Sequence, residues 1–183
     1  MNVLPTTIDG MLILEPRVFG DARGFFMESY NARDFDAIVG AETRFVQDNH
    51  SRSAHGVLRG LHYQLPPYAQ GKLVRVTQGE VFDVAVDLRR SSPSYGRWFG
   101  ITLSGSNPRM LWLPPGLAHG FVVTGESADF LYKTTAFHAP EAERCVRWDD
   151  AEIGIAWPEL KHPPLLSPRD ATAPLLADTE GFS

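Results

Sequence analysis

VFDVAVDL, residues 81–88, reads as a β-strand with one apolar and one acidic face. Successive side chains of a strand point to opposite sides of a sheet. One side of this strand therefore carries Phe82, Val84, Val86 and Leu88, and the other carries Asp83, Ala85 and Asp87. Outward from this stretch, 16 glycines and 14 prolines cut the chain into short apolar segments of the length that strands have.

The remaining apolar segments predict more strands and one helix. The predicted strands are Met11–Glu15, Gly24–Tyr30, Arg44–Ser51, Val57–Gln64, Leu73–Thr77, Val81–Leu88, Trp98–Leu103, Met110–Leu113, Gly120–Thr124, Phe130–Thr135 and Arg144–Trp148. The helix is predicted over Ala32–Val39, with Asn31 as its N-cap. This element content favours an all-β antiparallel sandwich or barrel in a single domain, 1–183. From Glu159 the chain is rich in proline, which predicts an extended C-terminal tail with a short helical turn after Pro174.

Several predicted strands carry aromatic and polar side chains on the same face. Phe45, Gln47 and Asn49 share one face of their strand, and Phe130 shares a face with Tyr132. A core that is only structural would not mix these residue types so often. The pattern predicts a ligand cavity inside the barrel.

Composition excludes several classes of function. The chain has 17 Lys and Arg against 22 Asp and Glu, a formal charge of −5, which argues against a nucleic-acid binder. Cys145 is the single cysteine, so the sequence fits a reducing cytoplasm and excludes a disulfide framework. No apolar run is long enough to cross a membrane. An anionic ligand would need a local cluster of positive groups, and Arg23, Arg59, Lys72 and Arg169 could supply it.

Histidines in two segments raise the possibility of a metal site. Metal-binding barrels of the cupin type use an HxH pair, a later glutamate and a PGxxH histidine. Here His62 and His119 occupy two of the four positions, but Gln64 stands at the second histidine and Lys72 falls near the glutamate position. A lysine ammonium would repel a divalent cation, so we predict no metal.

The same residues suit acid–base chemistry that needs no cofactor. His62 is the natural base, and a carboxylate such as Asp170 or Asp83 could orient its ring. Tyr132 could act as the acid. Lys72 or His119 could stabilise an enolate oxygen. Proton abstraction beside a carbonyl is therefore the favoured reaction class.

Most of residues 19–158 also resembles the dTDP-4-dehydrorhamnose 3,5-epimerase family. The matching segments are FGDARGFFMESYN (19–31), FVQDNHSRSAHGVLRGLHYQ (45–64), QGKLVRVTQGEVFDVAVDLR (70–89), SYGRW (94–98), LWLPPGLAHGF (111–121), YKTT (132–135) and WDDAEIGIAWP (148–158). The resemblance implies a cupin-like antiparallel jelly-roll barrel, a cytoplasmic homodimer, a dTDP-sugar substrate and no required cofactor.

Carried over by position, the resemblance assigns a role to each candidate. It implies His62 as the base paired with Asp170, Tyr132 as the acid, and Lys72 as the group that stabilises the enolate. The positions that match substrate-binding residues are Arg23, Glu28, Gln47, Asn49, Arg59, Lys72, Asp83, His119, Phe137, Glu143 and Arg169.

The chain departs from the family pattern at three places. Arg169 stands where a lysine is usual, and Phe137-His138 stands where tyrosines are usual. Strict alternation also puts Arg59 and His62 on opposite faces of their strand, unless Gly60 marks an irregularity or Arg59 serves the site from the strand start. Three alternatives remain open: an epimerase acting at one carbon only, a metal-dependent cupin enzyme, and a binding barrel without catalysis.

Overall fold

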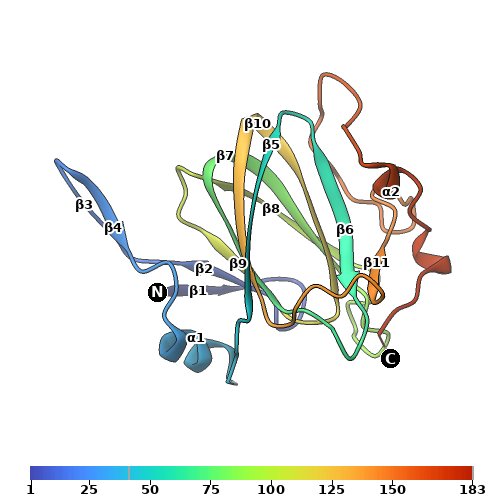
Figure 1. Ribbon diagram of the computed structural model, residues 1–183, viewed down its shortest axis with the longest axis horizontal. Coiled ribbons are helices and arrows are strands. Elements are labelled where there is room, and N and C mark those ends of the chain that lie inside the picture. The colour runs from blue at the N-terminus through green and yellow to red at the C-terminus, as the bar shows by residue number, and fades with distance from the viewer. Residues whose placement is uncertain (41, 183) are drawn as a thin grey trace.

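The computed structural model describes residues 1–40 and 42–182, which form an antiparallel jelly-roll barrel (Figure 1). Its strands are β1 (Asn2–Pro5), β2 (Leu12–Glu15), β3 (Val18–Asp21), β4 (Gly24–Met27), β5 (Gln47–Ala54), β6 (Leu58–Gln64), β7 (Lys72–Asp87), β8 (Trp98–Ser104), β9 (Met110–Leu113), β10 (Leu117–Thr134) and β11 (Glu143–Cys145). Its helices are α1 (Ala32–Val39), α2 (Pro168–Ala171) and the 3-10 turn η1 (Leu176–Asp178).

Two long strands organise the main sheet. The strand order is β1-β2-β9-β7-β10-β6-β11, with β5 also beside β10 and β8 also beside β7, and the strands pair antiparallel. The sequence predicts two strands where β7 runs, and two where β10 runs. Gly79 and Gly125 lie between the predicted pairs, but they bend β7 and β10 instead of ending them. The register of β7 against β10 shifts between Val123 and Ala128 at this bend.

The predicted parity of residues 81–88 is confirmed, and both faces of this strand are buried. Val84, Val86 and Leu88 pack in a cluster with Leu176 of the tail. Ala85 faces the opposite way, into a cluster with Phe121 and Phe130. The acidic side of the strand therefore points into the barrel.

Most local predictions hold, and the exceptions are short elements. The side chain of Asn31 caps α1 as predicted, and the helix ends at Gly40 in the left-handed region. Strands β1 and β3 and helix α2 are not predicted by the sequence, while β11 ends at Cys145 and not at Trp148. Beyond β11, Val146 still exchanges backbone hydrogen bonds with Leu61. No helix within residues 1–40 and 42–182 is long and apolar enough to cross a membrane.

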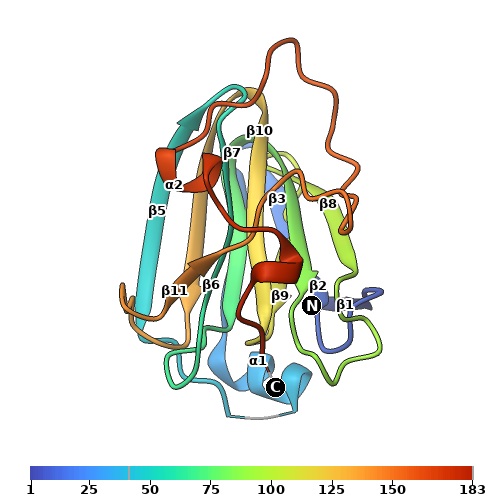
Figure 2. The same ribbon diagram turned by 90° about the vertical axis from the view of Figure 1, so that its right-hand side faces the viewer.

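Two segments leave the barrel on opposite sides. The β3–β4 hairpin projects away from the main sheet at one end of the molecule (Figure 1). The tail descends over the other side, where α2 lies beside β6 (Figure 2). The predicted extended tail and the helical turn after Pro174 are confirmed.

Candidate active site

A cavity of about 350 Å³ opens into the barrel, and most of the predicted site residues surround it. Its walls come from β5, β6, the start of β7, the segment from 138 to 143, and both arms of β10. The first arm of β10 is residues 117–123, before its bend, and the second arm is residues 128–134, after it. The lining residues are Gln47, Asn49, Ser51, Arg59, His62, Tyr63, Gln64, Gln70, Lys72, His119, Gly120, Phe121, Phe130, Tyr132, His138 and Glu143.

His62 and Asp170 form a hydrogen-bonded pair at the wall next to the tail. The Nε2 atom of His62 lies 2.6 Å from Oδ1 of Asp170, which is buried. Asp170 is held on α2, where the Ser167 side chain accepts a hydrogen bond from the Asp170 backbone N–H. Burial favours the protonated carboxyl, but the bond and charge of His62 outweigh it and lower the pKa of Asp170. The carboxylate therefore holds the Nε2 proton and leaves Nδ1 as the unprotonated nitrogen of the neutral ring.

Cys145 lies behind this pair. Its thiol donates to Oδ1 of Asp170 at 3.7 Å, and burial raises its pKa to about 12. Among the described residues, the ligand atoms of His62, Cys145 and Asp170 lie within 4.8 Å of one another. The short contact between His62 and Asp170 and the protonated thiol make this group a chain of hydrogen bonds, an arrangement unlike that of thiolate metal ligands.

A buried lysine and a second histidine–carboxylate pair lie in the cavity near His62. The Nζ atom of Lys72 donates to the His62 carbonyl at 3.3 Å. Burial lowers the pKa of Lys72 to about 8, although Glu143 and Asp83 act in the opposite direction. Nε2 of His119 lies 3.0 and 3.1 Å from the two oxygens of Asp83. Asp83 is fully buried, and this burial raises its pKa.

Tyr132 and two amide side chains form the opposite wall. Tyr132 lies on the second arm of β10 and pairs with Asn49 on β5. Burial raises the pKa of its phenol, which keeps the hydroxyl protonated. The Gln47 amide donates to Asn49 at 2.9 Å, so alternation on β5 delivers both amides to the cavity as predicted.

Gly60 explains how Arg59 and His62 reach the same cavity. The register of β6 against β10 shifts between His119 and Phe121, opposite Gly60, where φ is +127°. A Cβ atom at Gly60 would lie 2.5 Å from the Gly120 Cα, so only glycine fits. The irregularity suggested by the sequence is confirmed at this residue.

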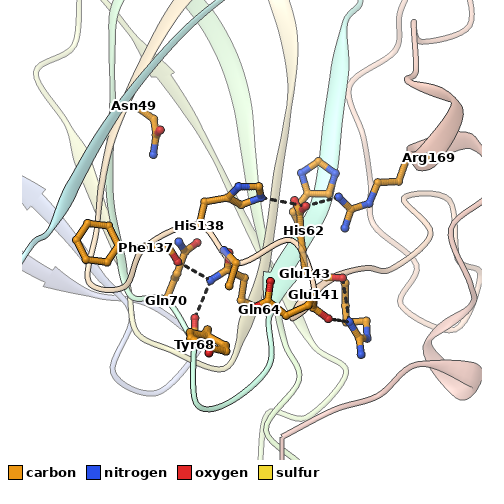
Figure 3. A network of polar contacts seen from close by, with 12 residues as sticks. Asn49, His62, Gln64, Tyr68, Gln70, Phe137, His138, Glu141, Glu143 and Arg169 are labelled. Atoms are coloured by element: carbon orange, nitrogen blue, oxygen red, sulfur yellow. Dashed lines mark hydrogen bonds and ion pairs between the residues drawn. The ribbon is translucent and has the colours of Figure 1, made fainter.

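A polar network closes the rim between the barrel and the tail (Figure 3). His138 contacts Oε2 of Glu143 at 3.2 Å, and Nη1 of Arg169 lies 2.5 Å from the same oxygen. Phe137 is exposed beside this network, and its carbonyl accepts a hydrogen bond from Gln64 at 3.1 Å. Arg169 thus stands at the mouth of the cavity, although Pro168 precedes it.

The structure does not bring Arg23 or Glu28 to the cavity of their own chain. Arg23 lies at the tip of the β3–β4 hairpin, its side chain is 90% exposed, and it pairs with Asp21. Glu28 is exposed just after the hairpin, and among the described hydrogen bonds it contacts only the side chain of Asn31. Within a single chain, neither residue lies with the other predicted site residues.

Sequence reasoning missed several cavity residues that share a strand face with a predicted one. Ser51 follows Gln47 and Asn49 by alternation, Gln64 follows His62, and Phe121 follows His119. Phe130 shares a face with Tyr132 in its predicted strand, but the sequence assigns it no role. Strand parity relates each of them to a predicted site residue, and Gln64 and Phe121 also stand in the segments that carry His62 and His119.

The jelly-roll barrel and the enclosed cavity, with its histidine–aspartate pair, tyrosine and buried lysine, place the chain among the sugar-nucleotide isomerases of this fold. The family model described as dTDP-4-dehydrorhamnose 3,5-epimerase matches residues 5–178. The chain belongs to this family.

Relatives and solved structures agree with this assignment. The dTDP-4-dehydrorhamnose 3,5-epimerase of Pseudomonas aeruginosa is 59% identical and aligns over 100% of this chain and 99% of its own. A crystal structure of the 3,5-epimerase of Legionella pneumophila with dTDP-4-keto-L-rhamnose has a TM-score of 0.94 at 50% identity, covering 98% of this chain and 94% of that one. A more distant relative, 39% identical over 97% of this chain and 85% of its own, is the dTDP-4-dehydrorhamnose 3-epimerase of Streptomyces niveus.

Proposed function

We propose that the chain epimerises carbon-3 and carbon-5 of dTDP-4-dehydro-6-deoxy-α-D-glucose, giving dTDP-4-dehydro-β-L-rhamnose for dTDP-L-rhamnose biosynthesis. The observation that carries the proposal is the pairing of His62 with Asp170 at 2.6 Å in the same cavity as Tyr132. The 4-ketone makes the hydrogens on both neighbouring carbons acidic. Inversion then needs one group to remove a proton and another to return one from the opposite face.

His62 is the base in this scheme. Nδ1 takes the proton as the C–H bond breaks, and the electron pair of that bond forms the enolate. Asp170 stabilises the imidazolium that results. The ammonium of Lys72, with His119 beside it, meets the negative charge that develops on the ketone oxygen.

Tyr132 is the acid in this scheme. Its phenol gives a proton to the enolate carbon on the face away from His62, and the ketone re-forms. The phenolate then regains a proton from solvent, and the His62 imidazolium releases the abstracted proton to solvent. The two groups stand on different strands, His62 on β6 and Tyr132 on the second arm of β10, which supports opposite approaches. The cycle occurs once at each carbon and needs no cofactor or metal.

The nucleotide occupies the outer part of the cavity in this proposal. Guanidinium groups match phosphate oxygens, so Arg59 and Arg169 bind the diphosphate. Gln47 and Asn49 offer amide groups to the thymine, and the exposed ring of Phe137 offers a stacking surface. Glu143 orients Arg169 at the rim.

We further propose a homodimer in which the hairpin completes the partner's site with Arg23 and Glu28. Support comes from their absence from the lining of their own cavity and from the exposed aromatic residues of the hairpin. Residues 1–183 act as one domain of a cytoplasmic enzyme, as the single cysteine suggests.

Deuterium exchange tests the function directly. Incubated in D₂O with the 4-keto sugar nucleotide, the protein is expected to place deuterium at carbon-3 and carbon-5. His62→Ala should reduce exchange about 10²–10⁴-fold while nucleotide binding persists. Label at one carbon alone would instead support a single-site epimerase like the Streptomyces niveus relative, and a wild type without exchange would support a binding barrel.

A further inference from the structure

The inner end of the cavity has an apolar surface to which the acid–base scheme gives no role. Among the described residues that line the cavity, only Phe121 and Phe130 contribute side chains without a polar atom. Their rings are stacked, with centroids 4.3 Å apart and planes 14° apart. Both rings are almost fully buried, Phe130 at 1% exposure and Phe121 at 5%.

The bend of β10 sets this pair directly beside the proposed catalytic groups. Phe121 lies two residues after His119 on the first arm of β10, and Phe130 lies two residues before Tyr132 on the second arm. Alternation therefore puts all four side chains on the inner face of the barrel. The His119 and Tyr132 rings lie 5.9 and 6.1 Å from the Phe130 ring. The aromatic pair thus forms a floor between these two groups.

The proposed substrate has one group that suits such a floor. Its hydroxyls and its ketone need hydrogen-bonding partners, which the rest of the cavity offers. Its 6-methyl group, attached to carbon-5, is the single apolar substituent of the sugar ring. A polar group pressed against the two rings would lose its water without gaining a partner.

We propose that Phe121, stacked on Phe130, is a specificity-determining residue that accepts the 6-methyl group and rejects a 6-hydroxymethyl group. The inference rests on the proposed function, since it concerns the orientation of that substrate. It also places carbon-5 near the two groups beside the floor, His119 and Tyr132, of which Tyr132 is the proposed acid.

Three sugar nucleotides test the inference on the wild-type protein. They are the 4-keto sugar with a methyl group at carbon-5, its pentose counterpart with hydrogen there, and its hexose counterpart with a hydroxymethyl group. The readout is kcat/KM for deuterium exchange at carbon-3, a position that the three sugars share. We expect the methyl sugar to exceed the pentose by about fourfold and the hydroxymethyl sugar by about 10–100-fold. Equal values for the methyl and hydroxymethyl sugars would overturn the proposal.

Variants separate recognition from a structural role of the ring. Phe121→Ser offers a hydroxyl partner and should bring the methyl-to-hydroxymethyl ratio to within about threefold, even if both rates fall. Phe121→Leu stays apolar and should keep the wild-type preference. Val123→Ser is the matched control, because Val123 is buried in the same core cluster and does not line the cavity.

The result for Phe121→Ser decides the role of Phe121, and the wild-type exchange decides the proposed function. A folded Phe121→Ser protein with the wild-type ratio would contradict the role of Phe121. If this variant does not fold, Phe121→Tyr keeps the ring, adds one hydroxyl, and is expected to lower the ratio in the same direction. Absence of exchange from all three sugars in the wild type would overturn the proposed function itself.

Discussion

The burial of Lys72 lowers its pKa, and this shift should set how the rate of the proposed reaction depends on pH. Burial lowers its pKa to about 8, and the proposed chemistry needs the protonated ammonium beside the enolate oxygen. The protonated fraction falls as the pH rises through this value, so kcat/KM should decline above about pH 8. The raised pKa of the Tyr132 phenol places its own ionisation at higher pH.

Substitutions assign the alkaline decline to its group. Lys72→Arg keeps the positive charge at all accessible pH values, so the decline near pH 8 should disappear. Lys161→Met removes an exposed lysine and should leave the profile unchanged. An unaltered decline in Lys72→Arg would show that another group titrates.

Tyr132 can be tested by separating proton removal from proton return. Tyr132→Phe removes the acid but leaves His62 and Asp170 in place, so hydrogen exchange with D₂O should survive better than net epimerisation. We expect net epimerisation to fall about 10²–10⁴-fold. The measurement compares deuterium incorporation with product formation by NMR. An equal fall in both would refute the assignment of Tyr132 as the acid.

Residue-level prediction from the sequence succeeds where contacts are local and fails where they span the chain. Alternation alone puts Gln47 with Asn49 and Phe130 with Tyr132 on cavity faces, because period two is fixed by backbone geometry. The contact of His62 with Asp170 joins residues 108 positions apart. No periodicity encodes such a contact, so the residues alone leave Asp170 and Asp83 as equal candidates, and only the family resemblance selects Asp170. His138 stands where the family usually has a tyrosine, and the sequence likewise does not predict that His138 contacts Glu143.

At the scale of elements, strand β6 depends on a single glycine. Gly60→Ala would place a Cβ 2.5 Å from Gly120 Cα at a positive φ, so we expect a loss of about 3 kcal/mol or more of unfolding free energy. Gly56→Ala is a matched control on the turn before β6. Its φ is +76° with open space around it, so it should cost about 1–2 kcal/mol. Urea denaturation measures both values, and equal costs would remove the special role of Gly60.

Elements also show why glycine is an ambiguous signal in a sequence. A glycine between two apolar runs predicts a turn, and Gly40 and Gly56 do occupy a helix end and a turn. Gly79 instead permits close approach to the Ser127 backbone, where a Cβ would overlap the carbonyl. The strand continues through it because β7 and β10 bend together. Whether a glycine ends or bends a strand depends on the neighbouring strand, which local sequence does not specify.

At the scale of the whole molecule, the formal charge is −5, yet several positively charged side chains gather at one place. Arg59, Lys72 and Arg169 converge on the cavity or its mouth, as the sequence suggested for an anionic ligand. Arg23 does not join them within one chain, because the hairpin carries it outward. The hairpin also exposes Phe25 and Phe26, at 70% and 66%. A two-stranded hairpin with exposed aromatic rings is marginal in water, which favours a second chain as its support.

Mixed dimers decide whether the hairpin serves the partner. Arg23→Ala and His62→Ala are each expected to have low activity at substrate concentrations far below KM, since each dimer then lacks one component in both sites. If the two variants are co-expressed in equal amounts, half of the dimers are mixed. In a mixed dimer, one site combines an intact His62 with the intact Arg23 of the other chain. About a quarter of wild-type activity should therefore return. Sedimentation of the same samples should show dimers.

His62→Ala co-expressed with Lys72→Met is the control, because both residues line the cavity of one chain and each chain of the mixed dimer keeps one defect. Recovery in the control, or its absence with Arg23→Ala, would overturn the shared site.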